Sequence, residues 1–372
     1  MADRIWLEID LGALRRNYRT LARSVSPAAL FPVIKADAYN LGAVEVARTL
    51  CDYAPTFCVA TPAEALEIIS YGKNVRLLGA LLNTEVGDVV HFGMVPSIPS
   101  LEVAQMLSEE AVRQRRTLDV MIKLDTGMGR LGFLPEEAPD AIAKIAALPN
   151  LRVTDIFSHF PVGYNVDHPM TREQLRLFRY VLDAVAERHI MIPNVHFANS
   201  DALCCLKESI RPPYNCARTG LSLYGFSPDP KLAACLDPVV SCYSHVIAVR
   251  RLPKGHNVGY ECTCTLTEDT DVALISAGYA DGLPLQLSNQ AEFLIRGYRC
   301  PVLGRVCMDY TMVSLAPLGG MLPDQGEIVT LIGSDTGETV SPEEWAKLKG
   351  THVYDILCSF GGRMERRYVA RT

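Results

Sequence analysis

Residues 30–35 read Leu30-Phe31-Pro32-Val33-Ile34-Lys35, an apolar run that ends at a lysine. A short apolar run bounded by polar residues is typical of a strand buried on both faces of a parallel sheet. Similar runs recur along the chain at 57–60, 75–78, 94–98, 118–124, 153–158, 195–198 and 216–218. The first two thirds of the chain therefore contain eight predicted buried strands.

Helical patterns separate these predicted strands, as at 44–53, 101–114 and 172–189. Thr171 and Gln174 fit a capping box at the start of the longest of them. Strands that alternate with crossover helices form a parallel sheet, and eight of them close most economically into a (β/α)8 TIM barrel. An open doubly wound sheet is the alternative, although the glycine-rich dinucleotide fingerprint after an early strand is missing.

The pattern changes after about residue 230. One helix is predicted at 341–348, and strand-like runs dominate the rest, at 239–249, 271–277, 293–302, 311–315 and 327–332. We therefore predict an α/β barrel over residues 1–230 and a mainly β domain over residues 231–372. Residues 1–10 alternate apolar and polar side chains and can pair with the β domain.

Composition restricts the partners and the cell compartment. The net charge of −6 argues against a nucleic-acid backbone or an anionic membrane surface as the main partner. No window reaches the roughly 18 apolar residues of a membrane span, and the first residues lack a secretory-signal pattern. The 12 cysteines are scattered without C-x-x-C spacing, which favours reduced thiols in a cytoplasmic protein over a disulfide or zinc scaffold.

Reactive side chains follow the predicted barrel strands, where chemistry is located in this fold. They are Lys35, Lys123, Asp125, His159, Asn199, Ser200 and Arg218. An amine that emerges from a buried strand has a lowered pKa, which favours Schiff-base chemistry with a carbonyl cofactor. Lys35 fits this description, although a lysine that simply reaches water from a strand end is the alternative.

Several motifs together resemble those of the bacterial alanine racemases, which use pyridoxal phosphate (PLP). They occupy residues 33–39, 123–132, 158–160, 198–200, 217–225, 258–260, 278–282 and 304–309, and so span almost the whole chain. The resemblance implies a PLP-binding barrel followed by a β domain, in agreement with the pattern above. It also implies an isomerase that interconverts L- and D-alanine for peptidoglycan precursor synthesis.

The resemblance assigns the proton transfers to two residues. Lys35 binds PLP and serves one face of the substrate, and Tyr260 serves the other face with Arg130 beside it. In the family this tyrosine comes from the partner subunit, which implies a homodimer with shared active sites. The resemblance also implies that Arg218 faces the pyridine nitrogen and that His159 braces Arg218.

Further residues are implied to bind the cofactor or the substrate. The remaining cofactor-binding residues are Tyr39, Asn199, Ser200, Gly220, Leu221 and Tyr354. The substrate is bound by Arg130 and the backbone amide of Met308, with Tyr279 at the entrance. Lys123 corresponds to a lysine that is often N-carbamylated in the family, although an ordinary ion-paired lysine is the alternative.

The chain also departs from the family pattern. Asn40 and Leu41 stand where Gly-His is usual, and Leu285 stands where a basic residue is common. These changes leave a serine or broad-specificity racemase open as the alternative function. An amino-acid decarboxylase and an inactive PLP carrier are the remaining hypotheses.

Overall fold

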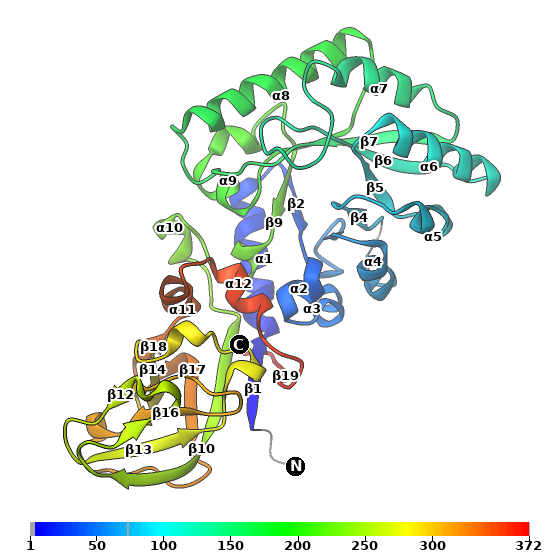
Figure 1. The fold of residues 1–372 in the computed structure, drawn as a ribbon. Coiled ribbons are helices and arrows are strands. Elements are labelled where there is room, and N and C mark those ends of the chain that lie inside the picture. Colours follow the sequence, from blue (N-terminus) through cyan, green and yellow to red (C-terminus); the bar gives the residue numbers. More distant parts are fainter. Residues whose placement is uncertain (1–3, 73, 372) are drawn as a thin grey trace. The chain divides into compact units, whose positions relative to one another are not determined.

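The computed structural model describes residues 4–72 and 74–371, which form two compact units (Figure 1). The larger unit consists of residues 13–38 and 42–237. Within these two segments the structure describes every residue except residue 73. The smaller unit consists of the described residues of 1–12, 39–41 and 238–372. The N-terminal strand therefore belongs to the same unit as the C-terminal third of the chain.

The larger unit is an eight-stranded parallel barrel with the strand order β2-β9-β8-β7-β6-β5-β4-β3. A parallel bridge between Val33 and Cys58 joins the two ends of this sheet, which closes the ring. All eight predicted strands and the barrel itself are confirmed. The strands are β2 (Ala29–Pro32), β3 (Cys58–Val59), β4 (Arg76–Leu77), β5 (Val95–Ile98), β6 (Leu118–Lys123), β7 (Leu151–Phe157), β8 (Asn194–His196) and β9 (Cys216–Thr219).

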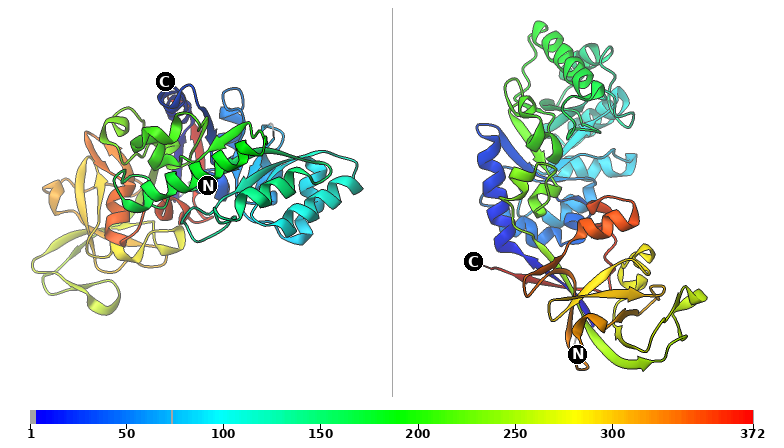
Figure 2. Two further views of the ribbon diagram at one scale, coloured as in Figure 1. Left: turned by 90° about the horizontal axis from the view of Figure 1, so that it is seen from above. Right: turned by 90° about the vertical axis from the view of Figure 1, so that its left-hand side faces the viewer.

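Helices connect the barrel strands and cover them with apolar faces. In α6, for example, Ala104, Leu107 and Ala111 are buried at helical spacing. Figure 2 shows the long green helix α8 along the outside of the unit. The helices are α1 (Leu11–Val25), α2 (Lys35–Asn40), α3 (Ala43–Leu50), α4 (Pro62–Ile68), α5 (Val86–Phe92), α6 (Leu101–Arg113), α7 (Ala138–Ala146), α8 (Pro169–Glu187), α9 (Ser200–Cys205) and α10 (Pro230–Ala233).

The capping box predicted for α8 is wrong. The helix begins at Pro169, whose fixed φ suits a first helical position, and His168 is the N-cap. Thr171 lies inside the helix and its hydroxyl donates to the carbonyl of Asn165 at 3.0 Å. Gln174 donates through Nε2 to the carbonyl of His159, also at 3.0 Å. The predicted cap residues therefore anchor the segment that follows β7.

The smaller unit contains a nine-stranded sheet. Six of its strands form a ring, β10-β13-β16-β15-β14-β17, closed by pairing between β17 and β10. Strand β1 adds to this ring beside β10 and also pairs with β19. The strands are β1 (Ile5–Asp10), β10 (Val240–Leu252), β13 (Thr270–Ile275), β14 (Glu292–Ile295), β15 (Tyr298–Leu303), β16 (Thr311–Ser314), β17 (Ile328–Asp335), β18 (Glu338–Val340) and β19 (Glu365–Val369).

The single strand predicted at 293–302 is in fact two strands. Strands β14 and β15 form a hairpin whose turn residues, Arg296 and Gly297, have φ of 52° and 78°. Positive φ at both positions is the geometry that a tight hairpin turn requires. The predicted helix is confirmed as α11 (Pro342–Lys349), with the capping box of Ser341 and Glu344.

Shorter elements complete the smaller unit. Strands β11 (Asn257–Val258) and β12 (Cys264–Thr265) form a small hairpin, and α12 (Val353–Cys358) follows α11. In the described part of both units, every helix is too short or too polar to cross a bilayer.

Candidate active site

Lys35 stands at the start of a left-handed helical turn, α2. Residues 36–40 all have positive φ, between 51° and 67°. Each such residue costs roughly 1–2 kcal/mol for an L-amino acid, so contacts from outside must hold the turn. The backbone N–H after Lys35 donates to Glu64 Oε1 at 2.9 Å, and Asp37 Oδ1 accepts from the N–H of Ala43 at 2.8 Å. These contacts fix the lysine at the end of β2.

Four basic side chains gather around His159, the residue that follows β7. Burial, and then the positive charges of Arg218, Arg130, Lys123 and Lys35, lower the pKa of His159 to about 3. The imidazole is therefore neutral at physiological pH. Lys35, Lys123, His159 and Arg218 stand at or after the ends of β2, β6, β7 and β9, so charges from several barrel strands act on this one imidazole.

Lys123 is the last residue of β6 and is almost completely buried. Burial is the main cause that lowers the pKa of Lys123 to about 7, and Arg218 and Arg130 lower it further while Asp125 opposes them. Its Nζ donates to the carbonyl of Leu124 at 2.6 Å. A large fraction of this amine is therefore neutral near pH 7, unlike an ordinary lysine.

Asp125 organises the loop that carries Arg130. Its Oδ1 accepts from the N–H groups of Gly127, Met128 and Gly129 at 3.0, 2.8 and 3.1 Å, and its Oδ2 accepts from the N–H of Arg130 at 2.9 Å. Burial acts to raise the pKa of Asp125, but these four donors outweigh it and lower the pKa. The ionised carboxylate thus fixes the backbone of Arg130, whose side chain remains exposed.

Arg218 is braced by His196, and among the described residues no hydrogen bond joins Arg218 to His159, the residue expected to brace it. Nη1 of Arg218 lies 2.6 Å from His196 Nδ1 and donates to the His196 carbonyl at 3.1 Å. Nη2 donates to the carbonyls of Ser158 and Phe197 at 2.6 and 3.3 Å. The four N–H groups on Nη1 and Nη2 of Arg218 are thereby all engaged in hydrogen bonds. Among the described residues, none accepts a hydrogen bond from the Nε–H of Arg218.

The sequence did not identify His196 as a site residue, because it stands inside an apolar strand, where a histidine is usually interpreted as part of the core. Strands β8 and β9 are neighbours in the barrel, and His196 pairs with Cys216, two residues before Arg218. Burial is the main cause that lowers the pKa of His196 to about 4, so the ring is neutral. The sequence signal that could have identified His196 as the partner of Arg218 is the presence of a histidine and an arginine on adjacent strands.

Ser200 and Gly220 lie side by side at the ends of β8 and β9. The N–H of Gly220 donates to Ser200 Oγ at 2.8 Å, so the glycine amide predicted to bind phosphate already has an acceptor. The Ser200 hydroxyl keeps its own proton to donate. Asn199 is the N-cap of α9 and accepts from the N–H of Ala202 at 3.0 Å, while Leu221 begins the 3-10 turn 221–224.

Tyr39 and Tyr354 come together in the smaller unit. Their ring centroids are 5.3 Å apart. Next to Tyr39, the side chain of Asn40 bonds to the carbonyl of Phe360 and to Arg366. The asparagine that departs from the family pattern therefore ties this turn to the C-terminal segment.

The side chains of the larger unit fit PLP. This cofactor combines an aldehyde, a pyridine nitrogen and a phosphate, which need an amine, a ring-nitrogen partner and hydrogen-bond donors. Lys35 supplies the amine, and Arg218 supplies an Nε–H that no described residue accepts. Ser200 supplies a hydroxyl at the start of α9.

Tyr279 and Met308 are joined through their backbones in the smaller unit. The N–H of Tyr279 donates to the carbonyl of Cys307, and the N–H of Ala280 donates to the carbonyl of Met308, both at 3.0 Å. Arg363, for which the sequence predicted no role, forms ion pairs with Asp281 at 3.1 Å and with Asp309 at 2.9 Å, one near each of the two residues. The two predicted substrate residues therefore share one support.

Tyr260 is supported by the same loop, 304–309. The adjacent Glu261 forms an ion pair with Arg305 at 2.5 Å. A Cβ at Gly304 would lie 2.2 Å from the carbonyl of Val258, so glycine is required for the close approach of the loop to this turn. Tyr260 is 69% exposed, and Tyr279 and Met308 are also exposed. The loop 304–309, which contains Met308, thus contacts the segments that carry both Tyr260 and Tyr279.

A methyl group at position 278 is expected to disturb this support. A Cβ on Gly278 would lie 2.3 Å from the carbonyl oxygen of Met308, so Gly278→Ala must displace the Met308 backbone. We expect a loss of about 1–3 kcal/mol in the free energy of unfolding, measured by urea denaturation. The control is Gly362→Ala, where nothing lies within 4 Å. Equal stability of the two variants would contradict the steric argument.

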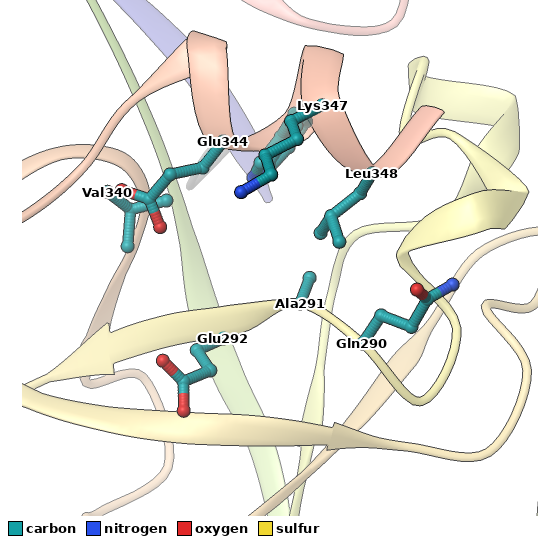
Figure 3. A pocket seen from close by; sticks show the side chains of 8 residues that line it. Gln290, Ala291, Glu292, Val340, Glu344, Lys347 and Leu348 are labelled. Carbon is teal, nitrogen blue, oxygen red and sulfur yellow. The ribbon is translucent and has the colours of Figure 1, made fainter. Parts of the chain in front are cut away.

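A separate pocket of about 190 Å³ lies in the smaller unit (Figure 3). Figure 3 shows Leu348 of α11 projecting toward Ala291. The carboxylates of Glu292 and Glu344 at its wall are ion-paired with Arg299 at 3.4 and 3.0 Å. None of the predicted catalytic or cofactor residues lines this pocket, so it is distinct from the candidate active site.

Comparison with known sequences gives matches over nearly the full length. Residues 9–228 match the family model for the alanine racemase N-terminal domain, and residues 239–368 match that for the alanine racemase C-terminal domain. The chain is 35% identical over 371 residues to an alanine racemase of Synechocystis sp., covering 98% of each chain. It is 34% identical over 373 residues to that of Methanococcus maripaludis, with the same coverage.

Solved structures agree with the sequence matches. The crystal structure of alanine racemase from D-cycloserine-producing Streptomyces lavendulae has a TM-score of 0.93 at 30% identity, covering 100% of this chain and 98% of that chain. The alanine racemase of Bartonella henselae, solved with covalently bound pyridoxal phosphate, has a TM-score of 0.90 at 29% identity. It covers 99% of this chain and 100% of that chain.

Proposed function

The chain belongs to the alanine racemase family and acts as an isomerase on alanine, and we propose that it does so with PLP by a two-base route. The observation that carries the proposal is the gathering of Lys35, Lys123, Arg130 and Arg218 around neutral His159. Such a site attracts an anionic cofactor and an amino-acid carboxylate. Within it, Lys35 is the amine on the strained turn, poised for a covalent bond.

When bound, PLP withdraws electrons from the substrate α-carbon and makes its proton acidic. Lys35 would hold the cofactor through its amine and would move the proton on one face of the substrate. The Tyr260 hydroxyl of the second subunit moves the proton on the opposite face, and Arg130 stabilises the phenolate. Arg218 donates its Nε–H to the cofactor ring nitrogen, because an arginine does not give up its proton.

The remaining residues bind and orient. The hydroxyls of Ser200, Tyr39 and Tyr354 and the amide of Leu221 hold the phosphate, with Asn199 and Gly220 fixing Ser200. The backbone N–H of Met308 holds the substrate carboxylate, and Tyr279 narrows the entrance. The exposure of Tyr260, Tyr279 and Met308 supports a homodimer whose two sites are shared across the interface. We place the enzyme in the cytoplasm, where it supplies D-alanine for peptidoglycan.

The direct test follows the ellipticity of each alanine enantiomer over time, with and without added PLP. We expect both enantiomers to reach the same racemic end point at a rate that depends on PLP. Parallel assays with serine and lysine enantiomers distinguish an alanine racemase from the serine-preferring or broad-specificity alternative. Protein that binds PLP but leaves both alanine enantiomers unchanged would contradict the proposal.

Lys123 is expected to carry a carbamate. Because only the neutral amine reacts with CO2, a pKa of about 7 makes this buried lysine reactive near neutral pH. ¹³C NMR of protein in labelled bicarbonate is expected to show a carbamate signal that grows as the pH rises through about 7. The signal should vanish in Lys123→Met and persist in Lys144→Met, a change at an exposed lysine of α7. No signal in the unmodified protein at pH above 7 would exclude the carbamate.

A further inference from the structure

A buried ion pair crosses the inside of the barrel beneath the candidate active site. Arg76 of β4 donates through Nε to Asp155 Oδ1 at 2.9 Å and through Nη2 to Oδ2 at 3.3 Å. Strands β4 and β7 are separated by two other strands in the barrel order. The Asp155 side chain has no exposure to water and that of Arg76 only 10%. None of the roles proposed above uses this pair.

Asp155 also reaches the residue that braces Arg218. Its Oδ1 lies 3.2 Å from Nε2 of His196. An arginine only donates hydrogen bonds, so His196 Nδ1, 2.6 Å from Arg218 Nη1, must be the acceptor. The single proton of the neutral imidazole is therefore on Nε2, 3.2 Å from the carboxylate oxygen but not aligned for a hydrogen bond with it, so the contact between the two groups is electrostatic. Four side chains form one chain of contacts in the order Arg76, Asp155, His196 and Arg218.

We propose that Asp155, held by Arg76, is a positioning residue that aims Arg218 at the cofactor by fixing the ring of His196. A carboxylate on one imidazole N–H fixes the tautomer and strengthens the opposite nitrogen as an acceptor. His196 is further held by Phe157, which stacks on it with ring centroids 5.1 Å apart. The proposal rests on the proposed function, because the aim of Arg218 matters only if a cofactor meets its Nε–H.

Stability alone is a weak reason for such a pair. Replacing a buried ion pair by apolar side chains of similar size is often neutral or stabilising, whereas removing one partner is strongly destabilising. Burial acts to raise the pKa of Asp155, but contacts with His196 and Arg76 outweigh it and keep the pKa far below its usual range. The carboxylate is thus permanently charged beside His196, which is what a positioning role requires.

The test compares two ways of removing the carboxylate. The double variant Arg76→Met, Asp155→Leu removes both charges together, and Asp155→Asn removes one charge without a change in shape. In ¹⁵N-labelled full-length protein, His196 is expected to show a bare Nδ1 and a downfield Nε2 proton. Both variants are expected to shift that proton upfield. With PLP and alanine, kcat is expected to fall about 10–100-fold with little change in KM.

The control removes the ion pair between Asp119 of β6 and Arg152 of β7, at 2.5 Å, with Asp119→Leu, Arg152→Met. This pair lies between two barrel strands and has no contact with His196, so the His196 signals and kcat should stay unchanged. If the double variant does not fold, Asp155→Asn decides. Unchanged His196 signals and kcat in folded protein would overturn the proposal. Because the NMR signals need no turnover, they remain decisive even if racemase activity is not found.

Discussion

Tyr260→Phe is expected to reduce alanine racemisation by about 10²–10⁴-fold, the usual contribution of one positioned acid–base group. The protein should remain folded and bind PLP as before, because Tyr260 is 69% exposed and its support comes from the backbone around Gly259 and Gly304. In deuterated water the variant should still exchange the α-proton of one enantiomer, through Lys35. Near-normal racemisation would refute the role of the tyrosine.

The same variant tests whether the sites are shared. Lys35→Ala and Tyr260→Phe proteins are each inactive in this scheme. If Lys35 and Tyr260 of one site come from different subunits, a mixed dimer has one site with both residues intact. Random exchange of subunits should then restore about a quarter of the normal sites. If both residues of a site come from one chain, mixing restores nothing.

Lys35→Ala is expected to abolish the absorbance of covalently bound PLP and to lower racemisation by about 10⁴-fold or more, since both the attachment and one proton carrier are lost. A small external amine such as methylamine should recover part of the rate, because it can enter the space left by the side chain. The control Lys144→Ala changes an exposed lysine on the outer helix α7. Retention of the bound-PLP absorbance in Lys35→Ala would show that another lysine binds the cofactor.

Residues whose role follows from a strand end could be predicted from sequence. The eight apolar runs and the barrel were predictable because buried parallel strands have a distinctive pattern, and Lys35, Lys123 and Arg218 follow from strand ends. Partners that depend on which strands face each other were not predictable. Arg76 and Asp155 are 79 positions apart, and only closure of the barrel brings them together.

Local geometry limited the prediction in the smaller unit. The hairpin at Arg296-Gly297 was read as one strand, because the apolar pattern continues across a turn that depends on backbone φ. The shared support of Tyr260, Tyr279 and Met308 depends on close backbone approaches, which residue spacing does not encode.

The left-handed turn after Lys35 also bears on the order in which the protein is assembled. Five residues in this conformation cost on the order of 5–10 kcal/mol, so an unfolded chain hardly samples the turn. Its compensating bonds come from Glu64 and Ala43, which are in place only once neighbouring helices have docked. The amine is thus presented only by a finished barrel, and a nascent or misfolded chain offers the coenzyme no preformed receptor.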